Sequence, residues 1–253
     1  MNPTPVVFIH GAWLHASSWD SWNERFASFG FAARAPGWPG EPATAREARR
    51  PSEAFHDLGL DALTEHYARI ARSYDTPPVI VGHSVGGLIA QHLLGTNVGR
   101  AAVAIAPAPV NHAGTPGTGE PWPASMEAGS FRRLFANAVT ERESDGLFER
   151  HAVPGPRRLL AELGHGGAVR HPRAVVDHGN TGRGPLLLIS GQEDRLVPDH
   201  VTRAVYKLYS DSTAASALKQ FPDRGHSLVI DSGWRAVADH VLVWLAERGV
   251  GAR

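Results

Sequence analysis

Short apolar runs alternate along the chain with longer stretches whose apolar positions recur at helical spacing. Glycine, proline or polar residues bound the short runs, which is typical of strands buried on both faces. Alternation of such strands with amphipathic helices predicts a parallel sheet covered by helices. The predicted strands are Val6–Ile9, Phe31–Ala35, Val79–Val81, Ala101–Ala106, Leu186–Ile189 and Ala217–Phe221. The predicted helices are Ser18–Phe29, Leu58–Tyr74, Val85–Leu94, Val201–Tyr209 and Trp234–Arg248.

One long stretch breaks this alternation. Residues 111–184 open with a loop-like run at 111–119 and then show helical patches without a strand pattern. We interpret this stretch as a helical lid, or cap, inserted over one face of the sheet. The expected fold is therefore α/β, a mostly parallel sheet with helices on both faces, whose core domain is formed by residues 1–110 and 185–253.

The charge balance of the chain limits its partners. Its 25 basic and 25 acidic side chains cancel, so no positive field is expected to hold nucleic acid or anionic lipid. The hydrophobic fraction of 42% and the charged fraction of 20% are ordinary for a globular protein. These values favour a small, weakly charged molecule as the partner.

The chain has no cysteine, which excludes disulfides, thiolate nucleophiles and cysteine-bound metals. Its first residues lack the pattern of a secretory signal, and no apolar run reaches the length of a membrane span. We expect a cytoplasmic protein that does not enter the membrane. The pattern says nothing about its oligomeric state.

The segment Gly82-His83-Ser84-Val85-Gly86 matches G-x-S-x-G between a predicted strand and a predicted helix. A nucleophile on such a sharp turn has a strained backbone, and glycines two positions away on either side remove the Cβ atoms that would clash. The backbone N–H of Val85, at the helix start, can then donate to an oxyanion. The alternative is a glycine-rich turn in which Ser84 is merely a cap.

A serine nucleophile needs a base, and 14 histidines are available. Around a G-x-S-x-G turn the acid and then the histidine follow the serine along the chain. Asp194 and His226 each follow a predicted strand, so the shared carboxyl edge of a parallel sheet can bring both to Ser84. Glu193 is a rival for the acid, and His83 is interpreted as a packing residue.

The loop after the first strand should supply a second oxyanion donor. His10-Gly11-Ala12-Trp13 occupies that place, and Gly11 allows a close backbone approach. We predict the N–H of Ala12 as the donor, with that of Trp13 as the alternative. His10 is expected to fix the loop through its ring nitrogens, while Trp13 either lines the pocket or fills core space.

Taken together, these motifs resemble the α/β-hydrolase superfamily over nearly the whole chain apart from the insertion. The His-Gly-Ala-Trp segment is similar to that of small esterases and hydroxynitrile lyases. The resemblance implies a cap after the sixth family strand, no cofactor and no metal, and a chain that starts at the family's third strand. A serine at position 84, where related enzymes carry aspartate, argues against epoxide hydrolase or haloalkane dehalogenase chemistry.

The expected activity is hydrolysis of a carboxylic ester, lactone or thioester of a small to medium, largely apolar molecule through an acyl-enzyme. Two alternatives stay open: a lyase or C–C bond-cleaving enzyme with the same triad, and a non-catalytic ligand-binding protein on this scaffold. The predicted substrate-contacting residues, each of which could instead belong to the core, are Trp13, Trp122, Met126, Phe131 and Phe135.

Overall fold

Six strands form one sheet in the order β2-β1-β3-β4-β5-β6 in the computed structural model, which describes residues 3–109, 122–163 and 175–251. Every pair of neighbours is parallel, which confirms the predicted fold class. The strands are β1 (Pro5–Ile9), β2 (Ala32–Arg34), β3 (Val79–His83), β4 (Ala101–Ile105), β5 (Leu186–Gly191) and β6 (Ser216–Phe221).

The four central strands, β1, β3, β4 and β5, are buried along their whole length, whereas β2 and β6 at the edges are partly exposed. A strand with helices on both faces has no polar face, which explains the unbroken apolar runs. The strand predicted at Phe31–Ala35 is shorter in the structure. Only its middle three residues pair with β1, and Phe31 instead packs against Phe26.

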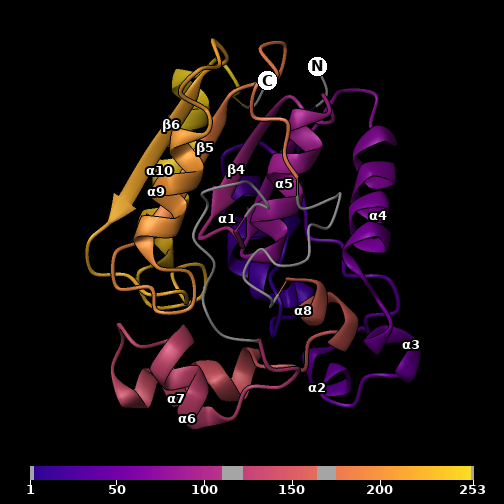
Figure 1. Cartoon of the computed structure of the whole chain (residues 1–253), viewed down its shortest axis with the longest axis vertical. Helices are drawn as coiled ribbons and strands as arrows, with labels where there is room; N and C mark the ends of the chain where they lie inside the picture. The colour runs from indigo at the N-terminus through magenta and orange to yellow at the C-terminus, as the bar shows by residue number, and fades with distance from the viewer. Residues whose placement is uncertain (1–2, 110–121, 164–174, 252–253) are drawn as a thin grey trace.

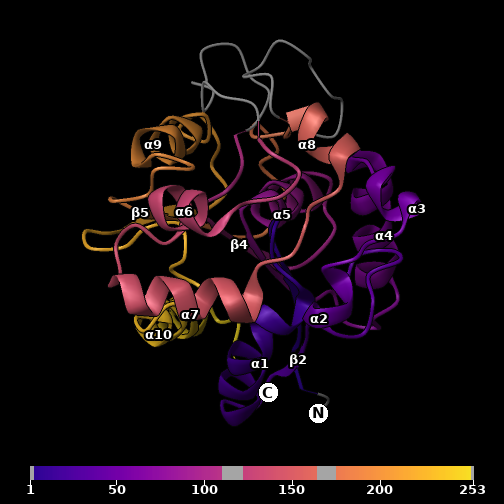
Figure 2. The same ribbon diagram turned by 90° about the horizontal axis from the view of Figure 1, so that it is seen from below.

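Helices cover both faces of the sheet (Figure 2). On one face lie α1 (Asp20–Ser28) and α10 (Trp234–Glu247), and on the other lie α4 (Leu60–Arg72), α5 (Val85–Gly95) and α9 (Asp199–Lys207). The helix predicted from Ser18 begins instead with a 3₁₀ turn, η1 (Ala16–Trp19). His15 caps that turn, because its ring accepts the N–H of Ser17.

The segment between β4 and β5 contributes α6 (Ala128–Ser130), a π turn η2 (Phe131–Phe135), α7 (Glu141–His151) and α8 (Arg157–Leu163). Together with α2 (Ala45–Ala48) and α3 (Glu53–His56), these helices lie at the carboxyl end of the strands (Figure 1). The described part of this segment holds no strand before β5. The predicted loop 111–119 lies outside the described residues, and a cap with those boundaries stays a prediction.

An aromatic cluster fills the space between β1 and α1. The ring of Phe8 lies 4.9 Å from that of Trp19, 6.0 Å from that of Trp22 and 5.1 Å from that of Phe26, measured between centroids. The indole N–H of Trp22 donates to the carbonyl of Val229 at 2.9 Å. The core of the amino-terminal half therefore holds the loop that follows β6 in place.

Candidate active site

Ser84 lies on the turn between β3 and α5 with φ 56° and ψ −118°, a conformation that L-residues rarely adopt. The glycines on either side make the turn possible. A Cβ on Gly82 would lie 2.0 Å from the carbonyl oxygen of Gly86, and one on Gly86 would lie 2.1 Å from that of Ile9. Only glycine at both positions lets the strand, the turn and the helix approach this closely.

Hydrogen bonds hold the backbone of Ser84 and leave its side chain free. Its N–H donates to the carbonyl of Ile105, and its own carbonyl accepts from Gly87 and Ala108, all at 2.9 Å. The Oγ atom is buried and has no hydrogen-bond partner within the described ranges. An unpaired buried hydroxyl costs stability, and this one belongs to the residue predicted as the nucleophile.

His226 follows β6 and Asp194 follows β5, and the structure brings the two side chains together. Nδ1 of His226 donates to Oδ2 of Asp194 at 2.7 Å, and both residues are buried. The other carboxylate oxygen accepts the N–H groups of Leu196 at 2.9 Å and Val197 at 2.8 Å. Because Nδ1 carries the proton, Nε2 of the neutral ring presents its lone pair, and the described residues offer it no partner.

Glu193, the rival acid, is turned away from this pair. Its residue is exposed, its N–H donates to the carbonyl of Arg224, and its carbonyl accepts from Asn137. Among the two carboxylates, Asp194 is therefore the one that contacts His226.

His83, interpreted from the sequence as a packing residue, is buried and also makes a specific hydrogen bond. Its Nε2 donates to the backbone carbonyl of His226 at 3.0 Å, and the two rings lie 4.6 Å apart. Burial, with the nearby charge of His226 as a smaller cause, lowers the pKa of His83 well below its usual value. The sequence indicated that His83 is packed, but not its hydrogen bond to His226, because that bond depends on how the loop after β6 folds.

Hydrogen bonds to Asp231 also hold the loop that carries His226, and the sequence did not predict them. The hydroxyl of Ser227 donates to the buried carboxylate of Asp231 at 3.0 Å, and the N–H of Gly233 donates to the same carboxylate at 2.9 Å. Burial raises the pKa of Asp231 despite these bonds. The carboxylate closes the loop that carries His226 against α10.

The loop after β1 lies against Ser84. A Cβ on Gly11 would lie 2.7 Å from the Cβ of Ser84, so the backbone there passes directly beside the serine predicted as the nucleophile. Neither the N–H of Ala12 nor that of Val85 has an acceptor in the part of the chain that the structure describes. Two unpaired donors next to a strained serine can stabilise an oxyanion.

The predicted substrate-contacting residues fall into different environments. Trp13 is buried, its indole N–H donates to the carbonyl of Pro123 at 2.8 Å, and its ring lies 5.5 Å from that of Trp122. The carbonyl of Trp13 also accepts the N–H of Val153 at 3.0 Å. Trp13 thus joins the loop after β1 to the segment between β4 and β5.

Phe131 and Phe135 are fully buried and stack at 4.7 Å, and the Phe135 ring lies edge-on to His226 at 4.9 Å. Met126 lines a cavity of about 580 Å³ together with Phe148 and Val153. Of these candidates, Phe135 is the one whose ring contact with the proposed triad is described. Substrate contact by any of them stays a prediction.

No group of three or more His, Asp or Glu side chains within the described ranges is arranged to hold a metal ion. Within the same ranges, no helix is both long and apolar enough to span a membrane.

A family model described as "Alpha/beta hydrolase family" matches residues 6–240. No curated protein sequence matches the chain. Among solved structures, a methylesterase from Arabidopsis superposes with a TM-score of 0.67 at 18% identity, covering 96% of this chain and 99% of that one. A monoacylglycerol lipase from Paleococcus ferrophilus gives 0.67 at 19% identity, covering 96% and 94%. A polyneuridine aldehyde esterase gives 0.66 at 16% identity, covering 95% and 98%.

Proposed function

The chain belongs to the alpha/beta hydrolase family and is a hydrolase, and we propose that it cleaves carboxylic esters through a triad of Ser84, His226 and Asp194. The observation that carries the proposal is the 2.7 Å contact between His226 and Asp194, together with Ser84 on a strained turn whose preceding residue, His83, donates to the carbonyl of His226. This arrangement combines a nucleophile, a base with a free lone pair, and an anion that fixes the tautomer of the base.

In the first half of the reaction, Nε2 of His226 takes the proton of Ser84 as Oγ attacks the ester carbonyl. The imidazolium that forms is stabilised by Asp194, which keeps its negative charge. The oxyanion of the tetrahedral intermediate accepts from the N–H groups of Ala12 and Val85. His226 then gives its proton to the departing alcohol, and the acyl group stays on Ser84.

In the second half, His226 removes a proton from water, which attacks the acyl-enzyme through the same oxyanion site. The carboxylic acid leaves, and the proton returns to Ser84. Every step uses groups of this chain and water.

The proposed substrate is an ester of a small to medium, largely apolar molecule. The Phe135 ring lies against His226, and the buried Trp13 belongs to the loop after β1 that carries Ala12, which supports an apolar substrate. The structural neighbours named above, a methylesterase, a monoacylglycerol lipase and a polyneuridine aldehyde esterase, support an ester as the substrate.

Labelling with a fluorophosphonate, followed by mass spectrometry of the peptides, tests the nucleophile. We expect one label on Ser84 of the folded protein, no label in Ser84→Ala, and full labelling in Ser125→Ala, a control at a serine between β4 and β5. A label on another residue, or none at all, contradicts the proposal.

A chromogenic ester distinguishes this proposal from a lyase that uses the same triad. An esterase that forms an acyl-enzyme releases a burst of alcohol equal to the enzyme concentration when deacylation is slow. Ser84→Ala should lower turnover by roughly five to six orders of magnitude. A protein that cleaves the ester without forming an acyl adduct on Ser84 is not the proposed hydrolase.

A further inference from the structure

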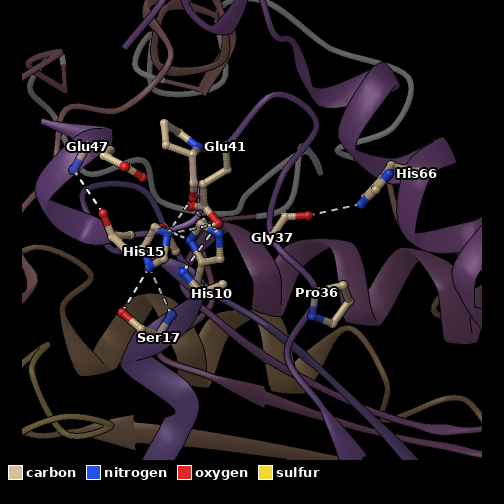
Figure 3. Close-up of polar contacts among 12 residues, drawn as sticks. His10, His15, Ser17, Pro36, Gly37, Glu41, Glu47 and His66 are labelled. Carbon is tan, nitrogen blue, oxygen red and sulfur yellow. Dashed lines mark hydrogen bonds and ion pairs between the residues drawn. The ribbon is translucent and has the colours of Figure 1, made fainter. Parts of the chain in front are cut away.

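Glu41 is a buried carboxylate that the proposed reaction does not use. Its side chain is only 4% exposed, and it lies between two histidines (Figure 3). Oε1 lies 3.2 Å from Nε2 of His10, and Oε2 lies 3.8 Å from Nε2 of His15. Oε2 also accepts the N–H of Ala16 at 3.4 Å. A carboxylate this buried needs such partners to offset its lost hydration.

The loop that carries Glu41 is itself held from α4. Nε2 of His66 donates to the carbonyl of Gly37 at 3.0 Å (Figure 3), and the hydroxyl of Tyr67 donates to that of Pro36 at 2.9 Å. A Cβ on Gly37 would lie 2.4 Å from Oε2 of Glu41, so the glycine leaves room for the carboxylate. The position of Glu41 is therefore set by the surrounding structure.

The charge of Glu41 is favoured in this place. Burial opposes ionisation, but the charge and hydrogen bond of His10, the charge of His15 and the N–H of Ala16 outweigh it, and the pKa of Glu41 lies below its usual value. The carboxyl is thus ionised at neutral pH and faces both rings, 3.2 Å from Nε2 of His10 and 3.8 Å from Nε2 of His15.

His10 opens the loop after β1 that carries Ala12, and His15 follows that loop. Nδ1 of His10 lies 3.0 Å from the carbonyl oxygen of Gly11, and the same ring stacks on Trp38 at 4.5 Å. A ring that donates to this carbonyl and to Glu41 at once carries a proton on each nitrogen and a positive charge, which the carboxylate beside Nε2 stabilises. The C=O of Gly11 and the N–H of Ala12 belong to one planar trans peptide and point in opposite directions. Holding the carbonyl therefore also fixes the direction of the N–H.

We propose that Glu41 is a positioning residue for the oxyanion hole: through the ring of His10 it holds the Gly11–Ala12 peptide with its N–H toward the reacting carbonyl at Ser84. This inference rests on the proposed function. It makes Glu41 and His10 a second carboxylate–imidazole pair, which orients a backbone donor as Asp194 orients His226.

His15 secures the other end of the loop. Its Nδ1 accepts the N–H of Ser17 at 3.1 Å, so Nε2 carries the proton and donates to the carbonyl of Pro42 at 3.0 Å. His10 contacts Glu41, and His15 donates to Pro42, the next residue in the chain. The two ends of segment 10–15 are therefore held by two adjacent residues.

Kinetics of Glu41→Ala on a 4-nitrophenyl ester, with Glu47→Ala as the control, test the proposal. Glu47 lies close by with an exposed side chain and no ion pair among the described residues. We expect kcat of Glu41→Ala to fall roughly 10- to 100-fold with KM within twofold, since a misdirected donor costs less than the loss of a donor, about 100- to 1000-fold. Glu41→Gln should recover part of the rate, because its amide oxygen still accepts from His10.

The inhibition constant of a trifluoromethyl ketone is a second measurement, and it should not change if the role of Glu41 is only structural. Its hemiketal with Ser84 places an oxyanion in the hole, so its inhibition constant should rise by the factor by which kcat/KM falls. In His10→Ala, further replacement of Glu41 by alanine should lower kcat less than twofold, because the ring that links Glu41 to the Gly11 carbonyl is already absent.

Fluorophosphonate labelling of each variant, together with its melting temperature, shows whether it is folded. A folded Glu41→Ala with wild-type kcat, or with lower kcat but unchanged ketone affinity, overturns the positioning role and leaves the proposed function standing. If Glu41→Ala does not fold, the same measurements on Glu41→Gln decide, and wild-type values there overturn the role. A wild-type protein that neither labels at Ser84 nor binds the ketone overturns both proposals.

Discussion

At the scale of single residues, the adjacent carboxylates Asp194 and Glu193 offer a matched comparison. Asp194→Asn should lower kcat by about 10⁴-fold, because the amide can donate to Nδ1 of His226 and leave Nε2 protonated, unable to act as a base. Glu193→Gln changes an exposed side chain and should leave kcat within about twofold. Initial rates of ester hydrolysis by the two purified variants measure the difference.

Equal losses in the two variants would contradict the assignment of the acid. The fluorophosphonate label on Ser84 should also form more slowly in Asp194→Asn, since that reaction needs the same base. Labelling at the wild-type rate would show that His226 does not depend on Asp194.

The residues predicted from the sequence are those whose type and backbone conformation are linked. Gly82 and Gly86 around Ser84 signal a strained turn, and Asp194 and His226 each follow a strand. Glu41 gave no such signal, because its role depends on a loop that brings it to His10, far away in the chain. The hydrogen bond from His83 was missed for the same reason.

At the scale of elements, two helical glycines should respond to alanine in opposite ways. Gly86→Ala places a Cβ 2.1 Å from the carbonyl oxygen of Ile9, which would push α5 from β1 and displace Ser84. We expect a loss of about 3 kcal/mol or more in the free energy of unfolding, and a loss of ester hydrolysis.

Gly146→Ala, inside α7, is the counterpart. Apart from its chain neighbours and the helix backbone, no heavy atom of the described residues lies within 4 Å of the added Cβ, and alanine favours the helix. The free energy of unfolding should rise by about 0.5–1 kcal/mol with unchanged activity. Urea titrations of both variants check the two signs, and a destabilised Gly146→Ala would show that α7 needs the glycine.

The strands and long helices were predictable because their burial imposes a period on the sequence. All six strands lie within a few residues of their predicted bounds. The helices α2 and α3 have four residues each, too few for a periodic signal, and side-chain caps at Thr44 and Ser52 hold them. The spacing of Phe131, Leu134 and Phe135 predicts a short helix at this place, but not that the turn is a π turn.

At the scale of the whole molecule, partly or fully buried histidines should make the fold sensitive to acid. Burial is the largest cause that lowers the pKa of His66, His83, His151 and His240, and it brings that of His151 to about 4. In the unfolded chain these rings titrate near 6.5. Between the two values the unfolded state binds more protons, so stability is full above pH 6.5 and falls as the pH decreases toward 4.

Urea unfolding at about pH 7.5 and about pH 5 measures this loss. In His151→Gln, which cannot take up a proton, the difference between the two pH values should shrink by on the order of 1 kcal/mol, since the ring is only partly buried. A difference that does not change in the variant would mean that His151 is protonated equally in both states.

The topology of the sheet determines when, during folding, the residues of the proposed triad can come together. Ser84 belongs to the half of the sheet that ends with β4, whereas Asp194 and His226 follow β5 and β6. The pairing of β4 with β5 must close a loop that contains all of residues 106–185. Closing so long a loop is entropically costly and slow. During refolding, recovery of ester hydrolysis should therefore lag behind the return of helical circular dichroism.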